Sequence, residues 1–158
     1  MANIDGSNRG TADLTEVLAE EDAGWTELHS LIDQLTPEEA VRPDYYAEGW
    51  SAKDLVAHVG AWLAQAGMML ERIAAGTYRR EDVDIDAVNQ LSLDAMRDIP
   101  FPTVKAVAAS ARTRMRHAVL ELKGPSPEAT WWIAKAGPEH YAEHLPRLRE
   151  LVAELRSP

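Results

Sequence analysis

The feature that most constrains the fold is the spacing of apolar residues in four long segments of the chain. In each segment, apolar side chains recur every third or fourth residue, the interval at which one face of an α-helix repeats. No segment keeps the strict alternation of a half-buried strand. The pattern predicts an all-α protein, an up-and-down four-helix bundle with connections of moderate length. These segments begin near Leu14, Ser51, Thr103 and Gly137.

Local signals define the ends of the second long helix. Ser51 and Asp54 have the spacing of a capping box, in which side chain and backbone at a helix start bond each other reciprocally. Trp50 and Leu55 form the apolar pair that often flanks such a start. Gly76 is typical of a left-handed C-terminal stop. We therefore expect a helix from about Ser51 to about Gly76.

Shorter pieces separate the long helices. Apolar spacing favours a short helix between residues 85 and 96, broken before Pro100. Residues 124–137 contain two prolines and are expected to form a loop with a short extended piece. The last helix should open at Pro138, where the missing N–H of proline costs nothing. Pro146 should kink this helix, because proline removes a backbone hydrogen bond and crowds the preceding turn.

The composition and charge of the chain exclude some classes of function and disfavour others. It has no cysteine, so thiolate metal sites and a cysteine nucleophile are excluded, and thiol chemistry needs an external thiol. The net charge of −10 disfavours nucleic acid and anionic lipid as partners. The N-terminus lacks the apolar stretch of a signal peptide. We expect a cytoplasmic protein with a small-molecule substrate, no membrane partner and a possible homodimer. Residues 1–11 are predicted to be a flexible tail, and 12–158 a single helical-bundle domain.

Three of the five histidines interrupt apolar stripes and form the candidate site. His140 and His144 are four residues apart, so both project from one helix face that continues into Leu148. Such a pair is a natural bidentate metal clamp. His58, on the core face of the second long helix, would add a third nitrogen. Burying three imidazoles without partners costs about 1–3 kcal/mol each, and a shared cation removes that cost.

Other interpretations compete with a metal site. A lone histidine on a core face is more often a hydrogen-bonded core residue than a ligand. His117, between charged neighbours, is expected to be exposed, and His29 to lie at the boundary of the first helix. Several aromatic side chains can line a pocket, although their spacing is also typical of an ordinary core: Trp62, Tyr141, Tyr45, Tyr46, Trp131 and Trp132.

Two stretches of the chain, residues 49–58 (GWSAKDLVAH) and 139–144 (EHYAEH), carry a resemblance to a known superfamily. Together with residues 86–89 (DAVN), they resemble the DinB-like superfamily of metal-binding four-helix bundles. The order and spacing of elements agree from about residue 12 to residue 155. The branch includes the N-terminal domain of mycothiol-dependent maleylpyruvate isomerases. A second similar branch holds small genotoxin-resistance proteins of the ClbS type.

The resemblance implies a metal triad of His58, His140 and His144, with zinc or nickel as the ion. For Asn89 it implies an amide beside the site, and the alternative is a helix-start residue that serves the backbone. Residues expected to border the substrate or to support the ligands are Asn89, Trp62 and Tyr141.

Three functions are compatible with these residues. The first is a metal-dependent S-transferase, isomerase-like enzyme or hydrolase, which would use an external low-molecular-weight thiol such as mycothiol in detoxification. The second is a ClbS-like resistance protein that binds or hydrolyses a toxic metabolite. The third is a non-catalytic bundle with a structural metal. No catalytic residue can be assigned from the sequence.

Overall fold

The computed structural model describes residues 14–43 and 49–158, and this part of the chain is helical without a strand. The all-α prediction is confirmed, while the predicted tail of residues 1–11 lies outside the described residues. The helices are α1 (Leu14–Ile32), α2 (Pro37–Ala40), α3 (Ala52–Ala75), α4 (Ile85–Met96), α5 (Phe101–Leu120), α6 (Pro127–Ala136) and α7 (Pro138–Arg156).

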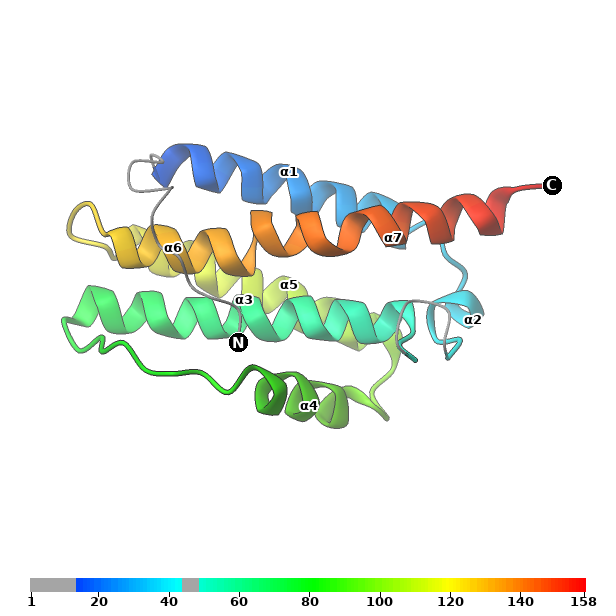
Figure 1. Ribbon diagram of the computed structural model, residues 1–158, viewed down its shortest axis with the longest axis horizontal. Helices are drawn as coiled ribbons and strands as arrows, with labels where there is room; N and C mark the ends of the chain where they lie inside the picture. Colours follow the sequence, from blue (N-terminus) through cyan, green and yellow to red (C-terminus); the bar gives the residue numbers. More distant parts are fainter. Residues whose placement is uncertain (1–13, 44–48) are drawn as a thin grey trace.

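The long helices lie side by side, with α6 and α7 nearly end to end (Figure 1). Helix α3 runs in the same direction as its closest neighbour α5. A Cβ added at Gly60 would contact Ala108, and one added at Gly67 would contact Met115. Seven residues further along α3 thus correspond to seven residues further along α5, which shows that the two helices are parallel. The predicted up-and-down order is therefore wrong, because consecutive long helices α3 and α5 are parallel.

The connection through α4 explains this parallel pair. After Gly76 the chain returns along α3 as an extended segment and then as α4, so that α5 starts at the end where α3 also starts (Figure 1). The short helix predicted between residues 85 and 96 is confirmed as α4, but the predicted up-and-down order required this stretch to connect antiparallel neighbours. A parallel pair needs a long crossover, and α4 with its flanking residues provides it. Lys53 Nζ donates to the Arg97 carbonyl at 2.9 Å and ties the end of this crossover to α3.

The predicted helix ends are largely confirmed. Ser51 and Asp54 form a full capping box at the start of α3, with Ser51 N–H donating to Asp54 Oδ2 at 2.9 Å. Gly76 ends α3 in the left-handed conformation, with φ 72°. The loop predicted for residues 124–137 is wrong. Ser126 caps α6 there, and Gly137 separates α6 from α7.

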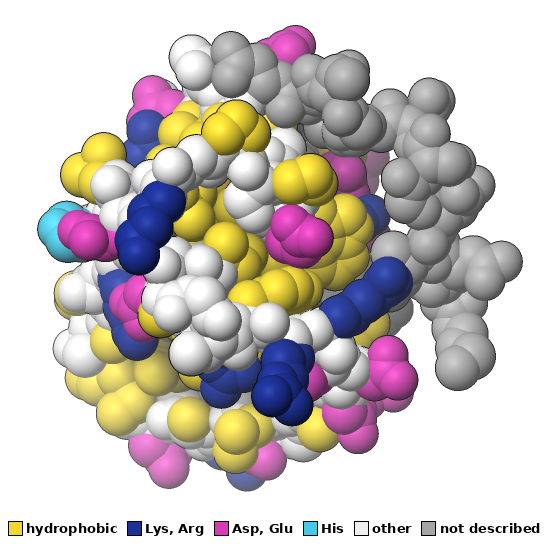
Figure 2. Space-filling view, turned by 90° about the vertical axis from the view of Figure 1, so that its left-hand side faces the viewer, with side chains coloured by type: hydrophobic (Ala, Val, Ile, Leu, Met, Phe, Trp, Pro, Cys, Tyr) yellow, Lys and Arg dark blue, Asp and Glu magenta, His cyan; other side chains and the backbone are white. Residues whose placement is uncertain are grey.

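The core lies between two helix pairs, α3 with α5 and α1 with α7. Its largest side chains come from the predicted stripes, including Leu28, Leu63, Met115 and Leu148. Figure 2 views the molecule from the end where α3 finishes and α1 begins, and apolar side chains are visible there among charged ones. Among the described residues, no helix is both long and apolar enough to cross a membrane.

Candidate metal centre

The three candidate histidines meet at the interface between α3 and α7. His58 comes from the second turn of α3, and His140 and His144 come from successive turns near the start of α7. One ring nitrogen from each can be chosen so that all three lie within 4.8 Å of one another. The ring centroids are 4.5 Å apart for His58 and His140, and 4.8 Å apart for His140 and His144. The rings therefore lie on facing surfaces of α3 and α7, where the spacing of the histidines along their helices predicted them.

The geometry of the rings fits a shared cation. His58 Nε2 and His140 Nε2 are 2.7 Å apart, a distance at which two neutral imidazoles share one proton. Two imidazole nitrogens on one tetrahedral zinc lie about 3.3 Å apart, given zinc–nitrogen bonds of about 2.0–2.1 Å. To hold an ion, this pair needs to separate by about half an ångström, and the third nitrogen, which lies within 4.8 Å of the other two, needs to approach them. The donor set, three imidazoles without thiolate, suits zinc, nickel and related divalent ions.

Burial keeps the imidazoles of His58 and His140 neutral at pH 7. It lowers the pKa of His58 to about 4, with a further contribution from the neighbouring His144. The pKa of His140 is lowered to about 3, chiefly by burial and also by charge on His58 and His144. A metal ligand must be deprotonated, so His58 and His140 are in their ligating protonation state at neutral pH.

Helix α4 contributes Asn89 to the edge of the cluster. Trp62 Nε1 donates to Asn89 Oδ1 at 2.8 Å, which links α3 to α4 and fixes the direction of the amide. The Asn89 side chain is also close enough to His58 to raise its pKa against the effect of burial. Ser92 Oγ, one turn further along α4, donates to the Ala57 carbonyl at 3.1 Å. Asn89 therefore lies beside His58 and is bonded to Trp62, while the predicted role of both residues in binding substrate stays a prediction.

The structure places Tyr141 elsewhere. Its side chain is only 2% exposed, and its hydroxyl donates to Glu21 Oε1 on α1 at 3.0 Å. Because consecutive helix residues point about 100° apart, Tyr141 faces α1 while its neighbour His140 faces α3. Its hydroxyl is thus engaged on the other side of α7 from the cluster.

The remaining predicted residues have separate environments. His117 is exposed, and His29 is half-buried with Nδ1 3.2 Å from the Trp25 carbonyl oxygen, as the sequence predicted. Trp132 Nε1 donates to the Tyr78 hydroxyl at 3.3 Å, and its ring packs edge-on against that of Trp131. Tyr45 and Tyr46 lie outside the described residues.

No carboxylate joins the three histidines in the described part of the chain. Asp54 is held by the capping box, where it bonds the Ser51 backbone, and Glu143 is exposed. Among the described residues, a metal on this cluster would find three ligands.

Two features of the site were missed from the sequence. Trp50 was assigned only to the helix start, yet its ring lies 4.8 Å from that of His58 between centroids. Glu21 is a fully buried acid on α1 that bonds Arg112, Arg116 and Tyr141. Its position four residues after Val17 and four before Trp25, on an apolar stripe, was the available signal.

Comparison with known proteins agrees with this fold and assigns the family. The chain is similar to an uncharacterised protein from Escherichia coli UTI89 of known crystal structure, with a TM-score of 0.74 and 16% sequence identity. The similarity covers 91% of this chain and 95% of that one, and it supports the fold alone. No curated protein matches the sequence.

Fold and sequence together place the chain among all-helical domains of the DinB-like superfamily. Within that class, it belongs to the mycothiol maleylpyruvate isomerase N-terminal domain family, whose model matches residues 21–155.

Proposed function

We propose that α1, α3, α5 and the α6–α7 pair act as a DinB-like four-helix bundle that holds one divalent metal ion on His58, His140 and His144. The bound ion would activate an external low-molecular-weight thiol for transfer to a reactive small molecule. The observation that carries this proposal is the convergence of three imidazoles within 4.8 Å, two of them buried and that of His144 half-buried, without an accompanying carboxylate in the described residues. Membership of a family named for mycothiol supports the thiol part.

The chemistry follows from the charge of the donor set. Three neutral imidazoles leave the full positive charge of a divalent ion uncompensated. Such an ion lowers the pKa of a bound water or thiol and favours the anionic, nucleophilic form. The absence of cysteine in the chain is compatible, because the nucleophilic sulfur would come from the thiol.

The side chains around the cluster would orient the reactants. Asn89 is fixed by its bond to Trp62, so its amide direction is set before any ligand binds. Trp50 and Trp62 place apolar rings beside the cluster, and both are partly exposed. These rings would limit water at the edge of the site while leaving it accessible from outside.

The metal assignment is tested by elemental analysis of protein purified without a histidine tag. We expect about one divalent ion per chain in the wild type, and its loss in His144→Ala. The helix content measured by circular dichroism should stay the same, because the apolar stripes hold the bundle. His117→Ala, at an exposed position, is the matched control and should keep its metal. Full occupancy in His144→Ala would contradict the triad.

The open coordination positions are tested with cobalt-substituted protein. Structural zinc is almost always closed by four protein ligands, whereas catalytic zinc usually has three and a water. Azide or a small thiol should therefore change the visible absorption bands of the cobalt protein. Visible absorption bands that do not change when either ligand is added would indicate a closed, structural metal site.

Assays of turnover distinguish the two remaining functions, the thiol transferase and the resistance protein. Consumption of an electrophile together with a thiol by the metal-loaded protein would support the transferase. Tight binding of a reactive metabolite without thiol consumption would favour the resistance function instead. The His144→Ala protein serves as the metal-free control in both assays.

A further inference from the structure

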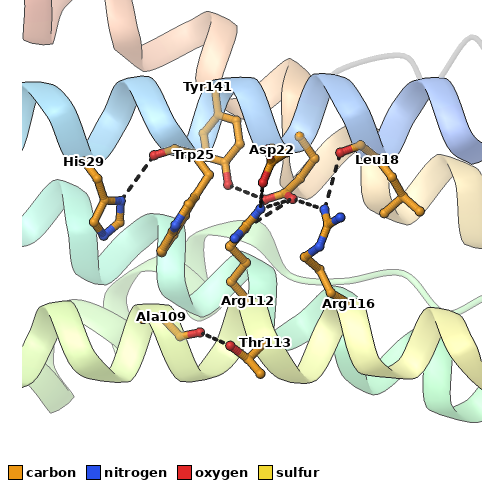
Figure 3. A network of polar contacts seen from close by, with 10 residues as sticks. Leu18, Asp22, Trp25, His29, Ala109, Arg112, Thr113, Arg116 and Tyr141 are labelled. Atoms are coloured by element: carbon orange, nitrogen blue, oxygen red, sulfur yellow. Dashed lines mark hydrogen bonds and ion pairs between the residues drawn. The ribbon is translucent and has the colours of Figure 1, made fainter.

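An ionic cluster around the buried Glu21 joins three helices on the side of α7 that faces away from the histidines. Glu21 on α1 is 0% exposed, and its carboxylate accepts hydrogen bonds from two arginines of α5. Arg112 donates through Nε to Oε1 at 2.9 Å and through Nη2 to Oε2 at 3.0 Å. Arg116 Nη1 donates to Oε2 at 2.7 Å. Figure 3 shows both arginines and Tyr141 directed toward the same point from different helices.

The cluster is balanced in charge and well partnered. Asp22 Oδ1 accepts from Arg112 Nη2 at 2.7 Å, so two carboxylates face two guanidinium groups. Arg116 also donates to the Leu18 carbonyl at 3.3 Å, and Arg112 lies over the Trp25 ring. A buried carboxylate with this many charge-assisted bonds has a defined position.

Two glycines make room for the cluster and for Tyr141. A Cβ at Gly24 would lie 2.3 Å from Cδ2 of Tyr141, so the tyrosine ring occupies the space that a side chain there would need. A Cβ at Gly137 would lie 2.8 Å from Cγ of Glu21. The ring of Tyr141 is therefore held by shape on one side and by the Glu21 carboxylate at its hydroxyl.

Tyr141 links this cluster to the metal centre through the backbone of α7. It follows His140 directly and precedes His144 by three residues, within one helical turn. Anything that fixes the rotation and axial position of Tyr141 fixes both imidazoles against His58. The tolerance is small, because the Nε2 atoms of His58 and His140 are only 2.7 Å apart.

We propose that Tyr141 is the positioning residue that aligns the His140–His144 pair with His58. Its ring is held by the Glu21 carboxylate and by the space that the missing side chain of Gly24 leaves. This inference rests on the proposed metal site. A purely structural cluster is the competing explanation, since a buried ion pair can stabilise helix packing without affecting ligand geometry. The two differ in what happens to the imidazoles when the tyrosine hydroxyl is removed.

The test compares Tyr141→Phe with Tyr78→Phe. Both variants remove one phenolic hydroxyl, but the hydroxyl of Tyr78 accepts a hydrogen bond from Trp132, whereas that of Tyr141 bonds Glu21. In Tyr141→Phe, Glu21 keeps its bonds to both arginines, so no buried charge is left without a partner. Gly24→Ala displaces the ring from the other side and provides a second perturbation.

Two measurements report the positions of the imidazoles. In metal-free protein, nitrogen-15 spectra of the imidazoles follow the exchange of the proton shared by His58 and His140. In cobalt-loaded protein, titration gives the dissociation constant and the visible bands. We expect faster proton exchange, altered bands and about tenfold weaker cobalt binding in Tyr141→Phe, in the range seen when supporting groups around ligands are lost. Gly24→Ala should act similarly, and Tyr78→Phe should match the wild type.

The inference is overturned if Tyr141→Phe lowers the melting temperature but leaves imidazole exchange and the cobalt dissociation constant at wild-type values. A wild-type protein that binds no cobalt would refute the proposed metal function. The exchange measurement in metal-free protein would still decide whether Tyr141 positions the rings.

Discussion

Acid should destabilise the metal-free protein through His58 and His140. Their folded-state pKa values are lowered to about 4 and about 3, chiefly by burial, whereas a histidine in an unfolded chain titrates near about 6.5. As pH falls below that value, the unfolded chain takes up protons and the folded chain does not. Their contribution to stability is therefore complete above pH ~6.5 and is lost progressively toward pH ~4 and below.

The magnitude follows from these pKa values. At pH 5, a histidine with an unfolded pKa of about 6.5 and a folded pKa of about 4 or lower destabilises the fold by about 2 kcal/mol relative to pH 8. The two side chains are 6% and 7% exposed, so solvent screens them little. Together they give a loss of up to about 4 kcal/mol, a large part of the 5–15 kcal/mol typical of a domain.

Urea unfolding with a metal chelator measures this loss. Free energies of unfolding would be determined between pH 8 and pH 5, where most carboxylates stay ionised in both states. In His140→Gln the loss should fall to about half, since one of the two titrating side chains is gone. His117→Gln, at an exposed position, should follow the wild-type curve.

Either of two results would refute this reasoning. One is a wild-type free energy of unfolding that changes by less than about 1 kcal/mol between pH 8 and pH 5 in chelator. The other is a His140→Gln protein that loses as much stability as the wild type. Both would mean that the buried imidazoles do not stay neutral in the folded chain.

Three further substitutions test the packing around the site. Gly60→Ala should lower the free energy of unfolding by about 1–3 kcal/mol, because its Cβ would lie 3.0 Å from the backbone Cα of Ala108; Gly124→Ala, in open space, is its control in urea unfolding. Ser51→Ala should cost about 1 kcal/mol in the same assay by removing the cap of α3. Pro146→Ala should raise the melting temperature by restoring a hydrogen bond inside α7, and unchanged metal affinity would show that proline does not set ligand geometry.

The sequence by itself predicted the elements that depend on local pattern. Apolar periodicity identified the long helices, and Ser51, Asp54 and Gly76 marked the ends of α3, because caps are built from neighbouring residues. The histidine pair of α7 was predictable for the same reason, since residues four apart share a helix face. The failure at α6 is also local: the prolines that suggested a loop include Pro127, which stands at the first turn, where helices tolerate it.

Only the tertiary structure decided how these helices are ordered and what lies between them. The parallel course of α3 and α5 depends on the path of the crossover through α4, and periodicity carries no information about helix direction. The ion pairs of Glu21 with Arg112 and Arg116 join residues more than ninety positions apart in the sequence. The environment of Tyr141 likewise follows from the space left by Gly24 on another helix. Such contacts form between segments that are distant in the sequence. Local patterns therefore identify the residues, but only the tertiary packing determines which of them are in contact.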